Sequence, residues 1–164
     1  VVIANEEDAE KVLGIHAADS DVEAGELAIT AYAGVAREIV RQFPNVGKVA
    51  ITLRESFSAT HNNWGAMLYD AATGETHLAP QAADGTYAPY EIRAIVDRVG
   101  GGDSFAAGLI FGLLCPDYPT AGDALRFAAA ASCLKHSILG DINYATRSEV
   151  DALMGGSASG RVNR

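Results

Sequence analysis

Apolar and polar residues follow one another along the chain in a pattern that predicts alternating strands and helices. Short apolar runs at 1–4 and 48–53 are typical of buried parallel strands. Between them, Asn5 is a suitable N-cap for a short helix over 6–14, and helical spacing of apolar residues predicts a longer helix over 27–43. The polar residues 16–26 are expected to form a loop.

The second half of the chain continues the alternation. Segments 65–70 and 75–80 flank a turn-like stretch and predict a hairpin, and 91–97 predicts another strand. Three glycines follow, and a helix rich in small and apolar residues is predicted from about Asp103. The remaining expectations are helices over 120–138 and 146–154 and a flexible tail over 155–164. The order of elements predicts one α/β domain with an at least partly parallel sheet.

The amino-acid composition indicates which kinds of binding partner are unfavourable. The 164 residues include 12 Lys or Arg and 21 Asp or Glu, which gives a net charge of −9. An acidic surface repels phosphate backbones and anionic headgroups, so we expect neither nucleic acid nor membrane as a partner. No apolar run approaches the roughly 20 residues that span a bilayer and no signal peptide is recognised, which favours a cytoplasmic location. Cys115 and Cys133 are expected to be reduced core thiols.

The segment "VDRVGGGDSFAAGL" carries the most specific chemistry. Successive glycines allow backbone N–H groups to point into one concavity, and a helix start adds partial positive charge there. Both features favour an oxyanion such as phosphate. Asp103 at such a place is explained if it accepts the proton of an alcohol that attacks a phosphoryl group. The spacing alone leaves a tight turn with Asp103 as a plain N-cap equally open.

This segment resembles the C-terminal signature of the ribokinase-like, or pfkB, carbohydrate kinases, in which an Asp and two further residues precede a small-small-Gly-Asp run. The resemblance implies that Gly100, Gly101 and Gly102 form the anion hole for the transferred phosphate. It implies that Asp103 is the catalytic base. It also implies that Asp97 helps to hold a monovalent cation, for which potassium is the candidate.

The start of the chain resembles a second motif of this family. "ANEED" is similar to the family's Asn-x-x-Glu motif, so Asn5 is expected to contact nucleotide and, with Asp8, to position magnesium through water. Asp8 stands where the family usually has Glu, and its side chain is one methylene shorter. A plain helix cap at Asn5 stays open beside this role.

Further resemblances concern the two substrates. "AITLRES" is similar to a nucleotide-contacting strand and turn, and Arg54, with the segment after it, resembles the 2-keto-3-deoxygluconate kinase branch. Arg54 either contacts nucleotide phosphate or is solvated. Ala128 and Ser132 either leave room for adenine or pack helices. Asp141 matches a Gly-Asp pair that approaches the sugar in that branch, whereas His136 is expected to be structural.

The resemblance implies an α/β, ribokinase-like three-layer sandwich with a mostly parallel sheet, here lacking the N-terminal part and the β lid. Residues 1–154 would form its nucleotide-binding, catalytic-base part, and 155–164 its tail. The implied activity is ATP-dependent phosphorylation of a small sugar or sugar acid, preferably 2-keto-3-deoxygluconate. The chain starts without Met inside an apolar run, so we expect a fragment that is inactive alone.

Three alternatives stay open at this point. The first is another kinase of the family, such as a fructokinase or a ribokinase. The second is a fragment that binds nucleotide without catalysis, in which the exposed edge of strand 1–4 predicts a homodimer or aggregation. The third, a Rossmann-type dinucleotide binder, is disfavoured because the glycines lie late in the chain and lack the G-x-G-x-x-G spacing.

Overall fold

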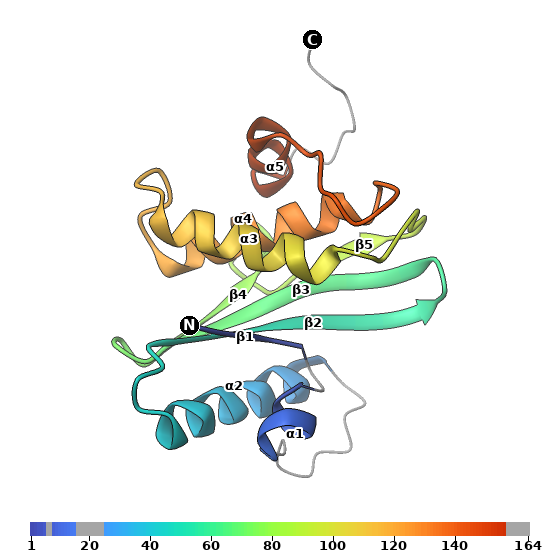
Figure 1. Ribbon diagram of the computed structural model, residues 1–164. Coiled ribbons are helices and arrows are strands. Elements are labelled where there is room, and N and C mark those ends of the chain that lie inside the picture. The colour runs from blue at the N-terminus through green and yellow to red at the C-terminus, as the bar shows by residue number, and fades with distance from the viewer. Residues whose placement is uncertain (6–7, 16–24, 157–164) are drawn as a thin grey trace.

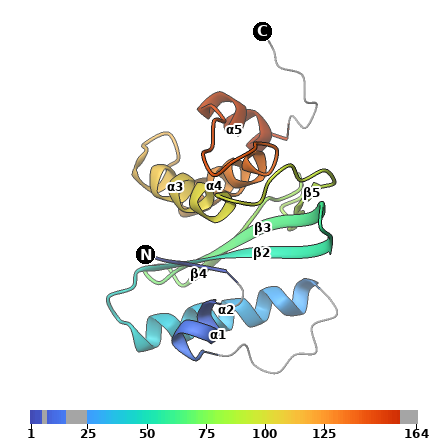
Figure 2. The ribbon, with the colours of Figure 1, turned by 45° about the vertical axis from the view of Figure 1, so that its right-hand side comes forward.

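The computed structural model describes residues 1–5, 8–15 and 25–156 and has three layers (Figure 1). The sheet lies between α3 and α4 on one face and α1 and α2 on the other, and α5 packs against α4 (Figures 1 and 2). In chain order the elements are β1 (Val2–Ala4), α1 (Asp8–Leu13), α2 (Gly25–Gln42), β2 (Lys48–Ser58), β3 (His61–Asp70), β4 (Glu75–Ala79), β5 (Tyr90–Ile92), α3 (Gly101–Leu114), α4 (Ala121–Lys135) and α5 (Arg147–Met154).

The sheet is mixed in the described part of the chain. β1 pairs with β2 in parallel, whereas the β2–β3, β3–β4 and β3–β5 pairs are antiparallel. The predicted α/β sandwich is confirmed, but its sheet is not mostly parallel in these strands. The reason is that tight turns at 59–60 and 71–74 join β2, β3 and β4, and short turns join only antiparallel neighbours.

Two apolar clusters hold the layers together. On one face of the sheet, Phe105 and Leu109 of α3 pack against Ala50. On the other face, Ile39 of α2 packs against Ile51. Successive residues of β2 therefore face opposite helices, as the pleat of a strand requires. This packing fixes α3 over the sheet, so the start of α3 has a defined place.

One predicted strand is wrong over most of its length. Of 91–97, only the first two residues belong to β5, and the amides of Val96 and Asp97 donate instead to His136 O at 2.8 and 3.3 Å. Conversely, no strand was predicted over 54–64, where β2 and β3 extend as a hairpin with Ser56 opposite Asn62. Exposed polar side chains hide the strand pattern there. The other predicted strands and helices are confirmed within the described residues.

Two sequence expectations lie largely outside the described residues, namely the loop over 16–26 and the tail over 155–164. None of the described helices combines the length and the apolar character that a bilayer crossing requires.

Candidate active site

The glycine turn forms the start of α3. Gly100 is the N-cap, with φ +78°, and its carbonyl accepts the first helical hydrogen bond from Ser104 N–H at 2.9 Å. The amides of Gly102 and Asp103 make no hydrogen bond to the part of the chain that the structure describes. This is usual in the first turn of a helix. These two N–H groups are therefore available to an anion.

Two cavities flank this helix start. The smaller measures about 180 Å³ and contains the sequence-predicted residues Asn5, Arg54, Gly101 and Gly102; its other lining residues are Thr52, Asn62, Trp64, Arg98 and His136. The larger measures about 490 Å³ and contains Asp103 and Asp141; its other lining residues are Ser104, Ala107, Gly108, Phe111, Phe127, Ala131, Asn143, Ala145, Arg147 and Val150. Six of the predicted residues therefore line one cavity or the other, on the two sides of the helix start, whereas Asp8, Asp97, Gly100, Ala128 and Ser132 line neither.

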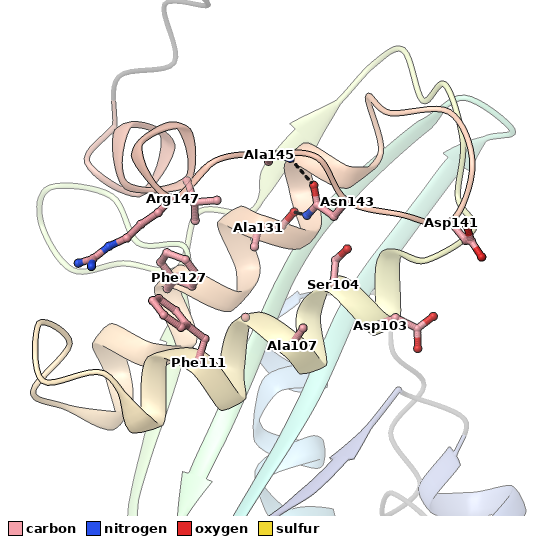
Figure 3. Close-up of a pocket in the computed structure, with 12 residues that line it drawn as sticks. Asp103, Ser104, Ala107, Phe111, Phe127, Ala131, Asp141, Asn143, Ala145 and Arg147 are labelled. Carbon is pink, nitrogen blue, oxygen red and sulfur yellow. Dashed lines mark hydrogen bonds between the residues drawn. The ribbon is translucent and has the colours of Figure 1, made fainter.

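The larger cavity has two unlike ends. Asp103 and Asp141 lie at one end, and Arg147 lies at the other beside Phe111 and Phe127 (Figure 3). The loop that carries Asp141 is held by Asn143, whose Nδ2 donates to Ala131 O at 3.0 Å and whose Oδ1 accepts from Ala145 N–H at 2.9 Å. The end of the cavity with the two carboxylates suits a ligand rich in hydroxyl groups.

Asp97 ties the glycine turn to the same loop. Its carboxylate accepts hydrogen bonds from Val99 N–H at 3.0 Å and from Gly140 N–H at 2.9 Å. These two backbone donors hold the pKa of Asp97 below its usual value, although partial burial opposes them. Asp97 therefore links the residues just before the helix start to the loop that carries Gly140. Its contact with a monovalent cation stays a prediction.

Buried polar contacts from α4 support the turn from beneath. Ser132 Oγ donates to Gly101 O at 2.7 Å, and His136 Nδ1 lies 2.8 Å from Ser132 O. Burial lowers the pKa of His136, so the neutral ring with its proton on Nδ1 fits this contact. His136 is thus structural, as expected.

The two small residues predicted beside adenine lie between helices. Ala128 and Ser132 are fully buried and line neither cavity, whereas Ala131 lines the larger one. The structure therefore gives them the helix-packing role that the sequence left open. Their contact with adenine stays a prediction.

Asn5 and Asp8 cap α1 reciprocally. Asn5 N–H donates to the Asp8 carboxylate at 2.9 Å, and Asp8 N–H donates to Asn5 Oδ1 at 3.0 Å. The helix cap that the sequence left open is thus formed, and Asn5 also reaches the smaller cavity. Amide and carboxylate oxygens suit Mg²⁺. Among the described residues no three His, Cys, Asp or Glu side chains gather as a metal site. The contact of Asn5 and Asp8 with magnesium stays a prediction.

Some residues at these cavities are not singled out by the sequence. Asn62 lies in the part of the β2–β3 hairpin that was not predicted, and the residues around it show no pattern that would mark it as a site residue. Arg98 lies only two residues before Gly100, and this position next to the glycine turn could have marked it as a site residue. The sequence predicts only that Arg147 lies near the start of a helix. In the structure its guanidinium lies 2.6 Å from the Asp117 carboxylate and 5.2 Å from the Tyr118 ring centre.

The smaller cavity lies at the carboxyl end of β1, and Thr52 and Arg54 line it from β2 just beyond the parallel pairing of these two strands. The carboxyl ends of parallel strands are where α/β proteins commonly bind ligands. Solved structures of carbohydrate kinases are similar to this arrangement. A 2-dehydro-3-deoxygluconokinase from Thermotoga maritima is 45% identical, with a TM-score of 0.77, over 94% of this chain and 41% of that protein. The resemblance to this family is therefore confirmed, and the chain spans about two fifths of the length of that relative.

Two other solved structures agree in fold. A PfkB family carbohydrate kinase from Listeria grayi is 27% identical, with a TM-score of 0.70, over 94% of this chain and 41% of its own. A candidate 2-keto-3-deoxygluconate kinase from Enterococcus faecalis, 22% identical, has a TM-score of 0.70 over 99% of this chain and 43% of its own. Comparisons with family models and with curated proteins found no match.

Proposed function

We propose that the protein to which this chain belongs transfers the γ-phosphoryl group of ATP to a hydroxyl group of a small sugar or sugar acid. The observation that carries the proposal is the start of α3, where the available amides of Gly102 and Asp103 lie beside the exposed Asp103 carboxylate. The similarity to a carbohydrate kinase at 45% identity supports it.

The two cavities suggest where each substrate binds. Among the residues that the structure describes, the smaller cavity is lined by Arg54 and Asn5 and by no carboxylate, and it suits nucleotide phosphates. Asp103 and Asp141 line the larger cavity and suit the hydroxyl groups of the acceptor. The helix start lies between the two, so phosphate and acceptor would meet at its amides.

The chemistry follows from this arrangement. The acceptor oxygen forms a bond to the γ-phosphorus while its proton passes to the Asp103 carboxylate. The bond between that phosphorus and the oxygen bridging to the β-phosphate breaks, and ADP leaves. The amides of Gly102 and Asp103 stabilise the charge that gathers on the transferred group. Magnesium, held by Asn5 and Asp8 through water, would neutralise phosphate charge, and a monovalent cation such as potassium would lie near Asp97.

The proposed acceptor is 2-keto-3-deoxygluconate, which would be converted to its 6-phosphate. Its support is the relative at 45% identity, whose substrate is the same compound under another name. The 164-residue chain by itself is proposed to bind nucleotide without turnover, since it spans only 41% of that relative.

The test is an ADP-release assay on the longer protein that contains this chain, supplied with ATP and magnesium. We expect kcat/KM with 2-keto-3-deoxygluconate to exceed the values with fructose and ribose at least tenfold. Higher activity with fructose or ribose would support the proposed kinase activity but contradict 2-keto-3-deoxygluconate as its acceptor. The absence of ADP release with every acceptor would contradict the proposed activity.

A further inference from the structure

A fully buried lysine ends α4, just before the loop that carries Asp141. Lys135 is 0% exposed, although lysine is among the residues that folded proteins almost never bury completely without a partner. In the described part of the chain, its Nζ donates a hydrogen bond to Ile138 O at 2.9 Å, in the loop that follows α4. One carbonyl dipole does not balance a buried positive charge. A negatively charged group is therefore expected near this ammonium.

Asp97 supplies that negative charge. Hydrogen bonds from Val99 N–H and Gly140 N–H are the main causes that hold the pKa of Asp97 below its usual value, and the positive charge of Lys135 lowers it as well. Burial lowers the pKa of the neighbouring His136, and the charge of Lys135 lowers it further. The ammonium is therefore within electrostatic reach of the Asp97 carboxylate.

The oxygens in this region already accept hydrogen bonds from the chain. Ile138 O accepts from Lys135, and His136 O accepts from the amides of Val96 and Asp97 at 2.8 and 3.3 Å. Each carboxylate oxygen of Asp97 accepts a hydrogen bond from a backbone amide. A potassium ion exchanges its hydration shell for such oxygens. It would compete with these donors and approach an ammonium of like charge, which repels it. The residues present therefore do not fit potassium.

We infer that the ammonium group of Lys135 is the monovalent cation of this site, so that the protein needs no potassium there. The inference rests on the proposed function and refines it, because a side chain replaces the dissolved ion proposed near Asp97. The ammonium links the loop after α4, through Ile138 O, to the residue that precedes the glycine turn. Its charge also offsets that of Asp97, which by itself opposes an anion at the helix start. Lys135 is thus a positioning residue.

The first test compares two salts in the ADP-release assay on the longer protein that contains this chain. Potassium chloride and tetramethylammonium chloride are used at the same ionic strength of about 0.1 M, so that charge screening is equal. Because the cation is part of the chain, the kcat of the wild type should differ by less than about threefold between the two salts. A larger activation by potassium would overturn the inference.

The second test removes the ammonium. Lys135→Ala leaves space for an ion, and in tetramethylammonium chloride its kcat should fall at least about tenfold, as for a lost interaction with a charged group. Potassium or ammonium chloride should restore most of that loss, whereas a plain helix-end role of Lys135 gives no such rescue. The matched control is Lys48→Ala, because Lys48 pairs with Asp70 at the start of β2; its kcat should be the same in both salts.

Thermal unfolding of the same proteins gives a readout that does not need turnover. A cation that binds the native state raises its Tm by mass action. The wild type should have the same Tm in both salts, whereas the Tm of Lys135→Ala should be higher in potassium chloride. Equal Tm values for Lys135→Ala in the two salts would contradict the inference, and a protein without ADP release would leave this result intact.

A second variant covers the case in which Lys135→Ala does not fold. Lys135→Met keeps the apolar stem and removes only the charge. Its kcat in tetramethylammonium chloride should also fall at least about tenfold. A Lys135→Met enzyme with the wild-type kcat would show that no cation is needed at this place. Because Tm and turnover are measured separately, failure of this inference is distinguishable from failure of the proposed kinase activity.

Discussion

Gly100 shows how a single residue sets the geometry of the candidate site. Its φ of +78° lies in the left-handed region, and a Cβ placed there would be 2.1 Å from Asp141 O. The turn and the loop that carries Asp141 can therefore approach each other only over a glycine. Gly102, two residues along, has ordinary backbone geometry and open space where a Cβ would lie.

We therefore predict unlike effects for two Gly→Ala substitutions in one turn. Gly100→Ala should lower the free energy of unfolding by more than about 1 kcal/mol, because left-handed backbone alone costs an L-residue roughly 1–2 kcal/mol. Gly102→Ala should change it by less than about 0.5 kcal/mol. Urea unfolding of the two variants measures both values. Equal stability of the two would show that the turn does not have this shape.

Residue types and spacing were sufficient to predict a helix start after the glycines, because these residues are consecutive and the helix does form. The roles of Gly100 to Asp103 in binding and catalysis stay predictions. The same reasoning could not bring Asn62 and Trp64 to the helix start. Their place depends on the hairpin β2–β3 and on the end of α4, which are far apart in sequence. Contacts between such distant segments cannot be recognised from a pattern of neighbouring residues.

At the scale of elements, the pair α3 and α4 positions the site through small residues. A Cβ on Gly112 would lie 2.8 Å from Ala124 Cα, and one on Gly108 would lie 3.0 Å from Ala128 Cα. The two helices are thus in close backbone contact along their length. This packing accounts for Ala128, one of the two small residues predicted beside adenine, and the other, Ser132, donates to Gly101 O.

This close contact predicts that Gly112→Ala destabilises the chain by about 1–3 kcal/mol, since overpacking forces the helices apart. Gly34→Ala in α2 is the matched control. Nothing lies within 4 Å of a Cβ there, so the better helix propensity of Ala should stabilise by up to about 1 kcal/mol. Thermal unfolding followed by circular dichroism compares the two. A Tm for Gly112→Ala at or above that of Gly34→Ala would be incompatible with the described contact.

The helices were easier to predict than the strands for a physical reason. A helix such as α2 carries its apolar face within its own sequence, whereas a strand depends on its partner. Residues 94–96 are apolar, yet the amides of Ile95 and Val96 donate to Thr60 O and His136 O outside any strand pairing, and Val96 is 57% exposed. The polar residues at the end of β2 nevertheless pair with β3, namely Arg54, Glu55, Ser56 and Ser58.

At the scale of the whole molecule, an acidic chain is proposed to bind two anionic substrates. The net charge of −9 opposes this, so binding depends on local positive potential at the smaller cavity. Asp103 and Asp141 are kept on the other side of the helix start. The homodimer expected from the exposed edge of β1 stays a prediction.

The measurement that tests the central claim most directly is the turnover of Asp103→Asn in the longer protein, together with its affinity for ATP. A lost general base predicts that kcat falls about 10²–10⁴-fold while the Kd for ATP stays within a few-fold. Asp84→Asn, in an exposed turn where the Asp84 carboxylate bonds to Thr86, is the control and should keep the wild-type kcat. An Asp103→Asn enzyme that retains more than about a tenth of wild-type kcat would contradict the role of Asp103 as the base.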